Sequence, residues 1–161
     1  MLTQERLKER LVYDPETGLF IWRSHRKSNY IGKQAGTKNI TGYIQISLEG
    51  KLYKAHRLAW LYMTGAMPQK HLDHKNRTTD DNRWENLREA TITENNGNSK
   101  IQLRNKSGHR GVVYYQGRWQ AQLMNRGKNI YLGRHKTKEE AAAAYRSAAI
   151  AYFGAFANVE S

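Results

Sequence analysis

The stretch Asp73-His74 is followed by Asn82-Arg83-Trp84-Glu85-Asn86-Leu87 and then by Glu94-Asn95, and this succession decides the fold that we expect. Residues 70–74 form a β-like run that ends at His74, and residues 86–91 form a second one after the polar loop. Residues 92–98 look like the start of a short helix. Two strands and a helix in this order predict a mixed α+β unit.

The polar side chains of this segment suit the hydrolysis of a phosphodiester bond. That reaction needs an activated water and a cation that stabilises charge on the phosphoryl oxygens. The imidazole of His74 can take a proton from water near neutral pH. The carboxylate of Asp73 and the amide oxygen of Asn95 are hard ligands, which suit Mg²⁺ or Mn²⁺ rather than zinc. The segment therefore predicts a nuclease site with one divalent ion.

This segment resembles the HNH endonuclease family, in particular its phage and intron-type homing members, over roughly residues 42–98. The resemblance is carried by Gly42-Tyr43, His56-Arg57-Leu58, Asp73-His74, Asp81-Asn82-Arg83, Asn86-Leu87-Arg88, Thr91 and Glu94-Asn95. It implies a ββα-metal fold in which His74 is the general base and Asp73 and Asn95 are metal ligands. Asn86 would orient the His74 loop or its imidazole.

One position departs from the family pattern. The family has a final histidine where this chain has Asn95, and an amide oxygen there predicts a preference for a harder metal. His71 alternates with Asp73 along the strand and lies outside the motif, and His56 is expected to be a structural histidine at the start of a core helix. For Asn76, Asp80 and Asn82 we expect roles in turns and helix caps.

The remaining N-terminal elements are expected to be one amphipathic helix, several β-hairpins and one buried helix. The helix is expected within residues 2–11, the β segments at 19–22, 43–48 and 52–55, and the buried helix at 56–63. We place the nuclease module at residues 1–98, a linker at 99–108 and a second module at 109–161.

The second module is expected to be a three-stranded antiparallel sheet packed on one helix. Its β segments are residues 111–115, 118–124 and 129–133, and a capping-box-like start at Thr137 begins an alanine-rich helix that runs to about Phe153. Strand alternation puts Trp119, Ala121 and Leu123 on the core side and Arg118, Gln120, Gln122 and Met124 on the other.

Residues 107–159 resemble the ethylene-response-factor-type DNA-binding domain. The resemblance is carried by Ser107-Gly108-His109-Arg110-Gly111-Val112, Gly117-Arg118-Trp119-Gln120-Ala121, Tyr131-Leu132-Gly133, Glu139-Glu140-Ala141-Ala142, Ala144-Tyr145 and Phe153-Gly154-Ala155-Phe156-Ala157-Asn158. It implies that the sheet enters the major groove of double-stranded DNA, with Arg110, Gln122 and Tyr131 on the contact face.

Charge and alternation add Arg118, Gln120, Lys128 and Arg134 to this expected contact set. Plant members carry further arginines on the first strand, where this chain has Val113 and Tyr115. Arginine is the commonest reader of guanine edges, so we do not expect the plant base preference to transfer.

The charge balance agrees with a polyanionic partner. The chain has 27 Lys and Arg against 14 Asp and Glu, a formal net charge of +13, and residues 101–138 contain no acid. A surface this basic attracts nucleic acid. A solvated basic face that serves only solubility is the alternative explanation.

Composition excludes several other classes. The 161 residues include no cysteine, which excludes disulfides and thiolate metal sites. The first residues lack the apolar core of a signal peptide, and no run approaches a membrane span. We therefore expect a cytoplasmic protein, in the host cell if phage-encoded, that has no obligate protein partner and is a monomer or weak dimer.

The combined expectation is a metal-dependent DNA endonuclease with a separate target-binding module. A linker would raise the local concentration of the catalytic module at the bound DNA. Removing residues 107–161 should then weaken DNA binding more than it alters the chemistry. The rival is a non-enzymatic DNA-binding protein on an HNH scaffold. An RNA nuclease is disfavoured, because a groove-reading sheet needs a B-form major groove.

Overall fold

The computed structural model describes residues 2–99, 101, 105–125 and 127–159. The chain divides into two compact units, Met1–Ala90 and Thr91–Ser161. Helices and small antiparallel sheets occur in both units, so the expected α+β class is confirmed. No helix within the described part of the chain is long and apolar enough to cross a membrane.

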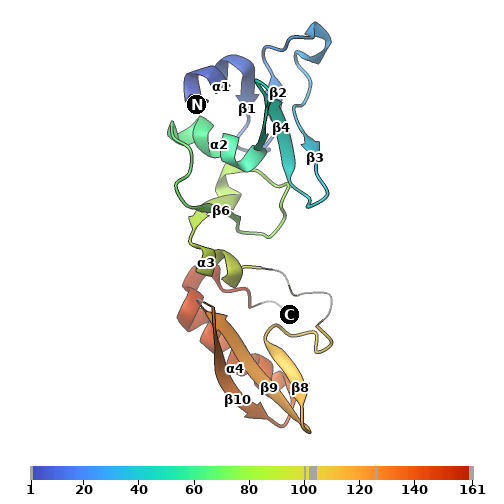
Figure 1. Ribbon diagram of the computed structural model, residues 1–161, viewed down its shortest axis with the longest axis vertical. Helices are drawn as coiled ribbons and strands as arrows, with labels where there is room; N and C mark the ends of the chain where they lie inside the picture. Colours follow the sequence, from blue (N-terminus) through green and yellow to red (C-terminus); the bar gives the residue numbers. More distant parts are fainter. Residues whose placement is uncertain (1, 100, 102–104, 126, 160–161) are drawn as a thin grey trace. The chain divides into compact units, whose positions relative to one another are not determined.

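Unit 1 packs two helices against small sheets (Figure 1). Its elements are α1 (Gln4–Arg10), β1 (Leu11–Tyr13), β2 (Phe20–Trp22), β3 (Thr37–Lys38), β4 (Ile44–Leu48), β5 (Lys51–Lys54), α2 (Ala55–Thr64), β6 (His71–His74) and β7 (Leu87–Ala90), with 3₁₀ turns at Ser28–Tyr30 and Trp84–Asn86. The sheets are β1-β2, β3-β4-β5 and β6-β7.

The core of unit 1 joins its first helix to its hairpins. Leu7 of α1, Phe20 of β2, Ile46 of β4 and Leu58 of α2 are all buried in one hydrophobic cluster. Burying a side chain of this size contributes roughly 1.5–3 kcal/mol. The helix α2 ends at Gly65, whose φ of 83° gives the left-handed conformation that closes many helices.

Two strands of unit 1 were not expected. The expected helix within residues 2–11 ends at Arg10, and Leu11–Tyr13 form the strand β1, which pairs with β2 and has Leu11 and Tyr13 buried and Val12 exposed. Residues 37–38 form the short strand β3 beside β4. Both strands are too short for their alternation to stand out from sequence.

Unit 2 begins with the short helix α3 (Ile92–Gly97). It continues with β8 (Val112–Tyr115), β9 (Arg118–Asn125), β10 (Lys128–His135), α4 (Lys138–Phe153) and a 3₁₀ turn at Gly154–Phe156. The sheet order is β10-β9-β8, all antiparallel, and α4 lies along one face of this sheet (Figure 1). The expected three-stranded sheet on one helix is confirmed.

The helix α4 can lie close to the sheet because its buried face is built from small residues. Ala141, Ala142 and Ala149 are buried, and Tyr145 and Phe153 fill the remaining space. A capping box between Thr137 and Glu140 starts this helix, as the sequence predicts. Val112, Ala121 and Leu123 supply the sheet side of the packing.

The division between the units differs from the expected domain limits. The unit boundary falls between Ala90 and Thr91, so α3 groups with the C-terminal elements and not with the β6-β7 hairpin that precedes it in sequence. Residues 100 and 102–104 of the expected linker lie outside the described residues. The described part of that segment, at Asn105 and Ser107, is a hydrogen-bonded turn.

Candidate functional site

The β6-β7 hairpin holds Asp73 and His74 at the end of its first strand. In its antiparallel register Asp73 lies opposite Arg88 and His74 opposite Leu87. Both side chains are buried, with 6% and 4% of their surface exposed. Burial of a carboxylate requires a partner, and Arg88 provides one through Nε and Nη2, at 2.9 and 2.8 Å from Asp73 Oδ2.

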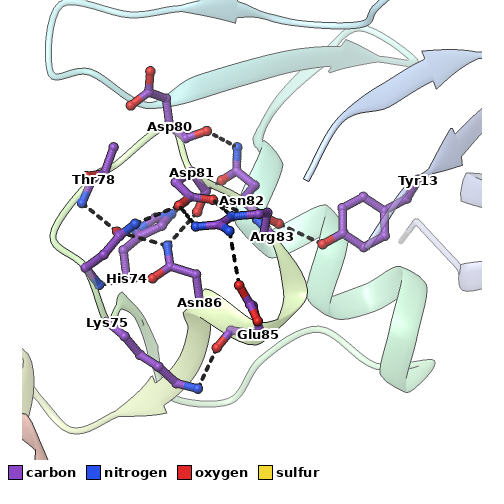
Figure 2. A network of polar contacts seen from close by, with 11 residues as sticks. Tyr13, His74, Lys75, Thr78, Asp80, Asp81, Asn82, Arg83, Glu85 and Asn86 are labelled. Atoms are coloured by element: carbon purple, nitrogen blue, oxygen red, sulfur yellow. Dashed lines mark hydrogen bonds and ion pairs between the residues drawn. The ribbon is translucent and has the colours of Figure 1, made fainter. Parts of the chain in front are cut away.

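The loop between the two strands is ordered by side-chain amides (Figure 2). Asn86 is buried; its Oδ1 accepts from the backbone N–H of Asn76 at 3.0 Å, and its Nδ2 donates to Asn76 Oδ1 and to the carbonyl of Asp81. Through these bonds Asn86, at the end of the loop, is joined to Asn76 near its beginning and to Asp81. They are the contacts through which Asn86 would hold the loop that follows His74.

Asn82 is the residue that sequence reasoning missed. Its Oδ1 lies 3.4 Å from His74 Nε2, although we expected only a turn or cap role for it. An amide oxygen only accepts hydrogen bonds, so this contact requires the imidazole proton on Nε2 and leaves the ring's lone pair on Nδ1. The tautomer that results is one that can take a proton at Nδ1.

The β1-β2 hairpin contacts the loop between β6 and β7 through Tyr13 on β1 and through Pro15 and Gly18 in its turn. The hydroxyl of Tyr13 donates to the carbonyl of Asn82 at 2.7 Å, and the N–H of Trp84 donates to the carbonyl of Pro15 at 2.9 Å. Gly18 has a φ of 73°, and a Cβ there would lie 2.4 Å from the backbone nitrogen of Arg83. Only glycine permits this approach.

Burial favours the neutral form of the His74 imidazole. Burial lowers its pKa below the ordinary 6.5, against the opposite effects of the Asn82 hydrogen bond and the charge of Asp73. In the same loop, hydrogen bonds from Arg83 lower the pKa of Asp81 to about 2. The loop therefore combines a fixed negative charge at Asp81 with a neutral imidazole at pH 7.

His56 packs beside this site. Its ring lies edge-on to His74 with centroids 5.0 Å apart, and Tyr43 contacts both rings. Burial, aided by the nearby positive charges, lowers the pKa of His56 to about 3. Its Nδ1 has no hydrogen-bond partner among the described residues, so it is a core histidine as expected, but only partly satisfied. His71, in contrast, is exposed on β6.

Asn95, the second expected metal ligand, lies on α3 in unit 2. Its backbone N–H donates to the carbonyl of Thr91 at 2.9 Å, within the helix. Its role stays a prediction. Across the described residues, no three His, Cys, Asp or Glu side chains gather as a metal-binding group. The expected pair of one carboxylate and one amide is not a group of that kind.

Most of the expected DNA contacts share one side of the unit 2 sheet. Gln122 lies opposite Tyr131, and Gln120 lies between Val113 and Arg134. With Tyr115 opposite Arg118, and Met124 opposite Asn129, these residues form the side of the sheet that faces away from α4, here called the outer face. Arg118, Tyr131 and Arg134 are exposed there.

Two of the expected contacts are placed differently. Lys128 is exposed, but it pairs with Asn125 and shares the alternation of Ile130, whose side chain packs on the core. Arg110 lies before β8 and directs its guanidinium to the backbone at the end of α3. The five contacts on the outer face are Gln122 and Tyr131, which the family resemblance implied, and Arg118, Gln120 and Arg134, which charge and alternation added.

Residues 53–97 match a family model described as HNH endonuclease. The match covers less than half of the chain and includes Asp73, His74, Asn86 and Asn95. This segment carries the sequence pattern of an HNH endonuclease domain. HNH nucleases generally use a divalent metal ion, and the match supports a nuclease or DNA-binding role.

Two further proteins are similar to parts of the chain. The ethylene-responsive transcription factor WRI1 of Arabidopsis thaliana is 48% identical over 56 residues, which are 32% of this chain and 13% of that protein. A solved structure titled "DNA binding and cleavage by the HNH homing endonuclease I-HmuI" matches with a TM-score of 0.40 and 26% identity, covering 51% of this chain and 47% of that one. The chain thus spans a small part of the first and about half of the second.

Proposed function

We propose that this protein is a metal-dependent DNA endonuclease of the HNH homing type, with His74 as its general base. The observation that carries the proposal is a buried, neutral imidazole beside a carboxylate, inside the segment that matches the HNH family. A phage-type origin and action in the host cytoplasm belong to the same proposal.

The proton chemistry follows from the tautomer that Asn82 favours. Nδ1 of His74 accepts a proton from a water molecule, and that water attacks the phosphorus atom of the DNA backbone. The phosphorus–oxygen bond to the leaving sugar breaks as the new bond forms. Asn86 keeps the loop fixed during this step through its bonds to Asn76 and Asp81.

Asp73 and Asn95 are the residues that would hold a divalent ion, Mg²⁺ or Mn²⁺. The donor chemistry of Asp73 fits, since its carboxylate offers hard oxygen atoms of the kind that Mg²⁺ and Mn²⁺ prefer. Oxygen ligands from a carboxylate and an amide suit hard cations. When bound, such an ion stabilises negative charge on the phosphate oxygens.

The outer face of unit 2 is proposed to hold double-stranded DNA. No acidic residue occurs on strands β8, β9 and β10, and the exposed guanidinium of Arg118 can pair with phosphate. The amides of Gln120 and Gln122 are suited to base edges. Lys128 would add charge beside this face. The chain would act as a monomer or weak dimer.

The experiment that tests the nuclease is conversion of supercoiled plasmid DNA with Mg²⁺ or Mn²⁺. We expect nicking by the wild type, loss of nicking in His74→Ala, and loss with a chelator. Competition between duplex DNA and RNA of the same sequence identifies the substrate. A protein that shifts duplex DNA in a gel and cuts nothing with either metal would support the non-enzymatic DNA-binding alternative.

A further inference from the structure

The helix α3 is too short to be stable by itself. It has six residues, Ile92–Gly97, whereas isolated helices below about 12 residues are marginal in water. Its beginning is closed by a capping box, in which Thr91 accepts from the N–H of Glu94 and the Glu94 carboxylate accepts from the N–H of Thr91. Its end exposes backbone carbonyls that need donors from elsewhere.

Arg110 supplies those donors. Its Nη1 donates to the carbonyls of Gly97 and Ser99 at 2.8 and 2.6 Å. Its Nη2 donates to Ser99 Oγ at 2.9 Å and to the carbonyl of Asn96. A cation at this end also complements the helix dipole. The forked guanidinium therefore binds the backbone carbonyls of three residues at the end of α3, namely Asn96, Gly97 and Ser99.

Asn158, near the end of the described chain, adds a second attachment. Its backbone N–H donates to the carbonyl of Gly97 at 3.1 Å, and its buried side chain donates from Nδ2 to the carbonyl of Ser99 at 3.0 Å. Phe153 of α4 packs against Gly97, where a Cβ would lie 2.8 Å from the ring. We call Arg110 and Asn158 with these acceptors the helix clamp.

We infer that Arg110 is a positioning residue, which holds α3 and the Asn95 side chain on it, and not a reader of DNA bases. The inference rests on the proposed function for the part played by Asn95. Four hydrogen bonds occupy the two terminal nitrogens of Arg110, and a bidentate contact with guanine would require these same nitrogens to leave the helix.

The clamp makes the target-binding module part of the nuclease. Arg110, Phe153 and Asn158 all belong to the segment expected to be a separate DNA reader, yet they fix the helix that carries a proposed metal ligand. Removing residues 107–161 would therefore free α3 and damage the chemistry as well as DNA binding. This reverses the expectation drawn from the sequence alone.

The test compares Arg110→Met with Arg118→Met, which removes an exposed arginine of the outer face. Three quantities are measured in the full-length protein: DNA affinity in chelator, amide hydrogen exchange in α3, and the rate of plasmid nicking at saturating DNA as Mn²⁺ is raised. For Arg110→Met we expect DNA affinity within about twofold, at least tenfold faster exchange of the α3 amides, and nicking reduced about tenfold with a higher Mn²⁺ requirement.

For Arg118→Met we expect the opposite pattern, weaker DNA binding with unchanged α3 exchange. The inference is overturned if Arg110→Met loses as much DNA affinity as Arg118→Met while the α3 amides stay protected. If no variant and no wild type cuts DNA, the proposed nuclease fails, but exchange and affinity still decide the role of Arg110. Should Arg110→Met not fold, Arg110→Lys, which keeps the charge and loses the fork, gives the same comparison with a smaller change in exchange.

Discussion

The loop of unit 1 and the outer face of unit 2 hold their polar groups in opposite ways. Asp73, His74 and Asn86 are buried, and partners from the loop or the facing strand hold each of them. Arg118, Tyr131 and Arg134 stand exposed on a sheet. The first arrangement fixes geometry, so single substitutions should be severe. In the second, binding of DNA is spread over several exposed side chains, so a single substitution should weaken DNA binding only slightly.

The largest expected effect is on the loop of unit 1. Replacing the proposed general base in His74→Ala should reduce plasmid nicking by about 10²–10⁴-fold, since that is the usual contribution of acid–base catalysis. DNA binding in a gel shift should be unchanged. His71→Ala, an exposed histidine of the same strand, serves as the control and should nick normally. Equal loss in both variants would refute the assignment of His74.

The second largest effect is expected on stability, from breaking the ion pair between Arg88 and Asp73. Arg88→Met leaves the buried Asp73 carboxylate without that partner, and breaking a buried pair costs about 3–5 kcal/mol. We expect urea unfolding to show that loss. Lys38→Met removes the exposed pair with Asp80 and should cost less than about 1 kcal/mol. Similar losses in the two variants would contradict the distinction between buried and exposed polar groups.

Acid should weaken unit 1 through His56. Its folded pKa is about 3 against an ordinary 6.5, so the unfolded chain binds the extra proton between these values. The stabilisation from the neutral ring is complete above pH 6.5 and decreases as the pH falls, by up to about 1.4 kcal/mol per unit. His74, whose pKa is also lowered, acts in the same direction.

The measurement is the free energy of unfolding in urea at pH 7, 6 and 5. His56→Phe, which keeps a ring of similar size, should flatten the dependence. An equally steep decline in that variant would show that other groups cause the acid sensitivity.

The smallest effect is expected on the outer face. Arg118→Met should lower DNA affinity by about threefold to tenfold and reduce the slope of log affinity against log salt by about one, as for one lost phosphate contact. Arg146→Met removes an exposed arginine of α4, on the other side of the sheet, and should change neither quantity. If the two variants weaken binding equally, the basic surface acts without a defined face.

The same contrast explains what the sequence could predict. Strand alternation has a period of two, so residue order alone predicted that Arg118, Gln120 and Gln122 of β9 share one face. Arg134 reaches this face through a register shift after Tyr131, which alternation does not predict. The helix α4 and its capping box were also predictable, because their sequence signals lie within a few residues of each other. Family resemblance supplied the roles proposed for Asp73, His74, Asn86 and Asn95, and those roles stay proposals.

Contacts that join distant segments were not predictable. Asn82 reaches His74 only because the loop folds back, and that loop is supported by Tyr13, far away in sequence. The direction of Arg110 depends on where α3 ends, which no pattern near Arg110 encodes. Lys128 was expected to contact DNA because of its charge, and that role stays a prediction, since its strand position alone places it on the side of Ile130.

The helix clamp also limits how this protein could exchange modules with others. A recombination point placed in residues 99–108 would separate α3 from Arg110 and Asn158, which donate hydrogen bonds to the carbonyls of Gly97 and Ser99. A join at Ala90–Thr91 would transfer the helix together with its attachments. Chimeric nucleases with a new target-binding domain should therefore inherit α3 from the donor of that domain.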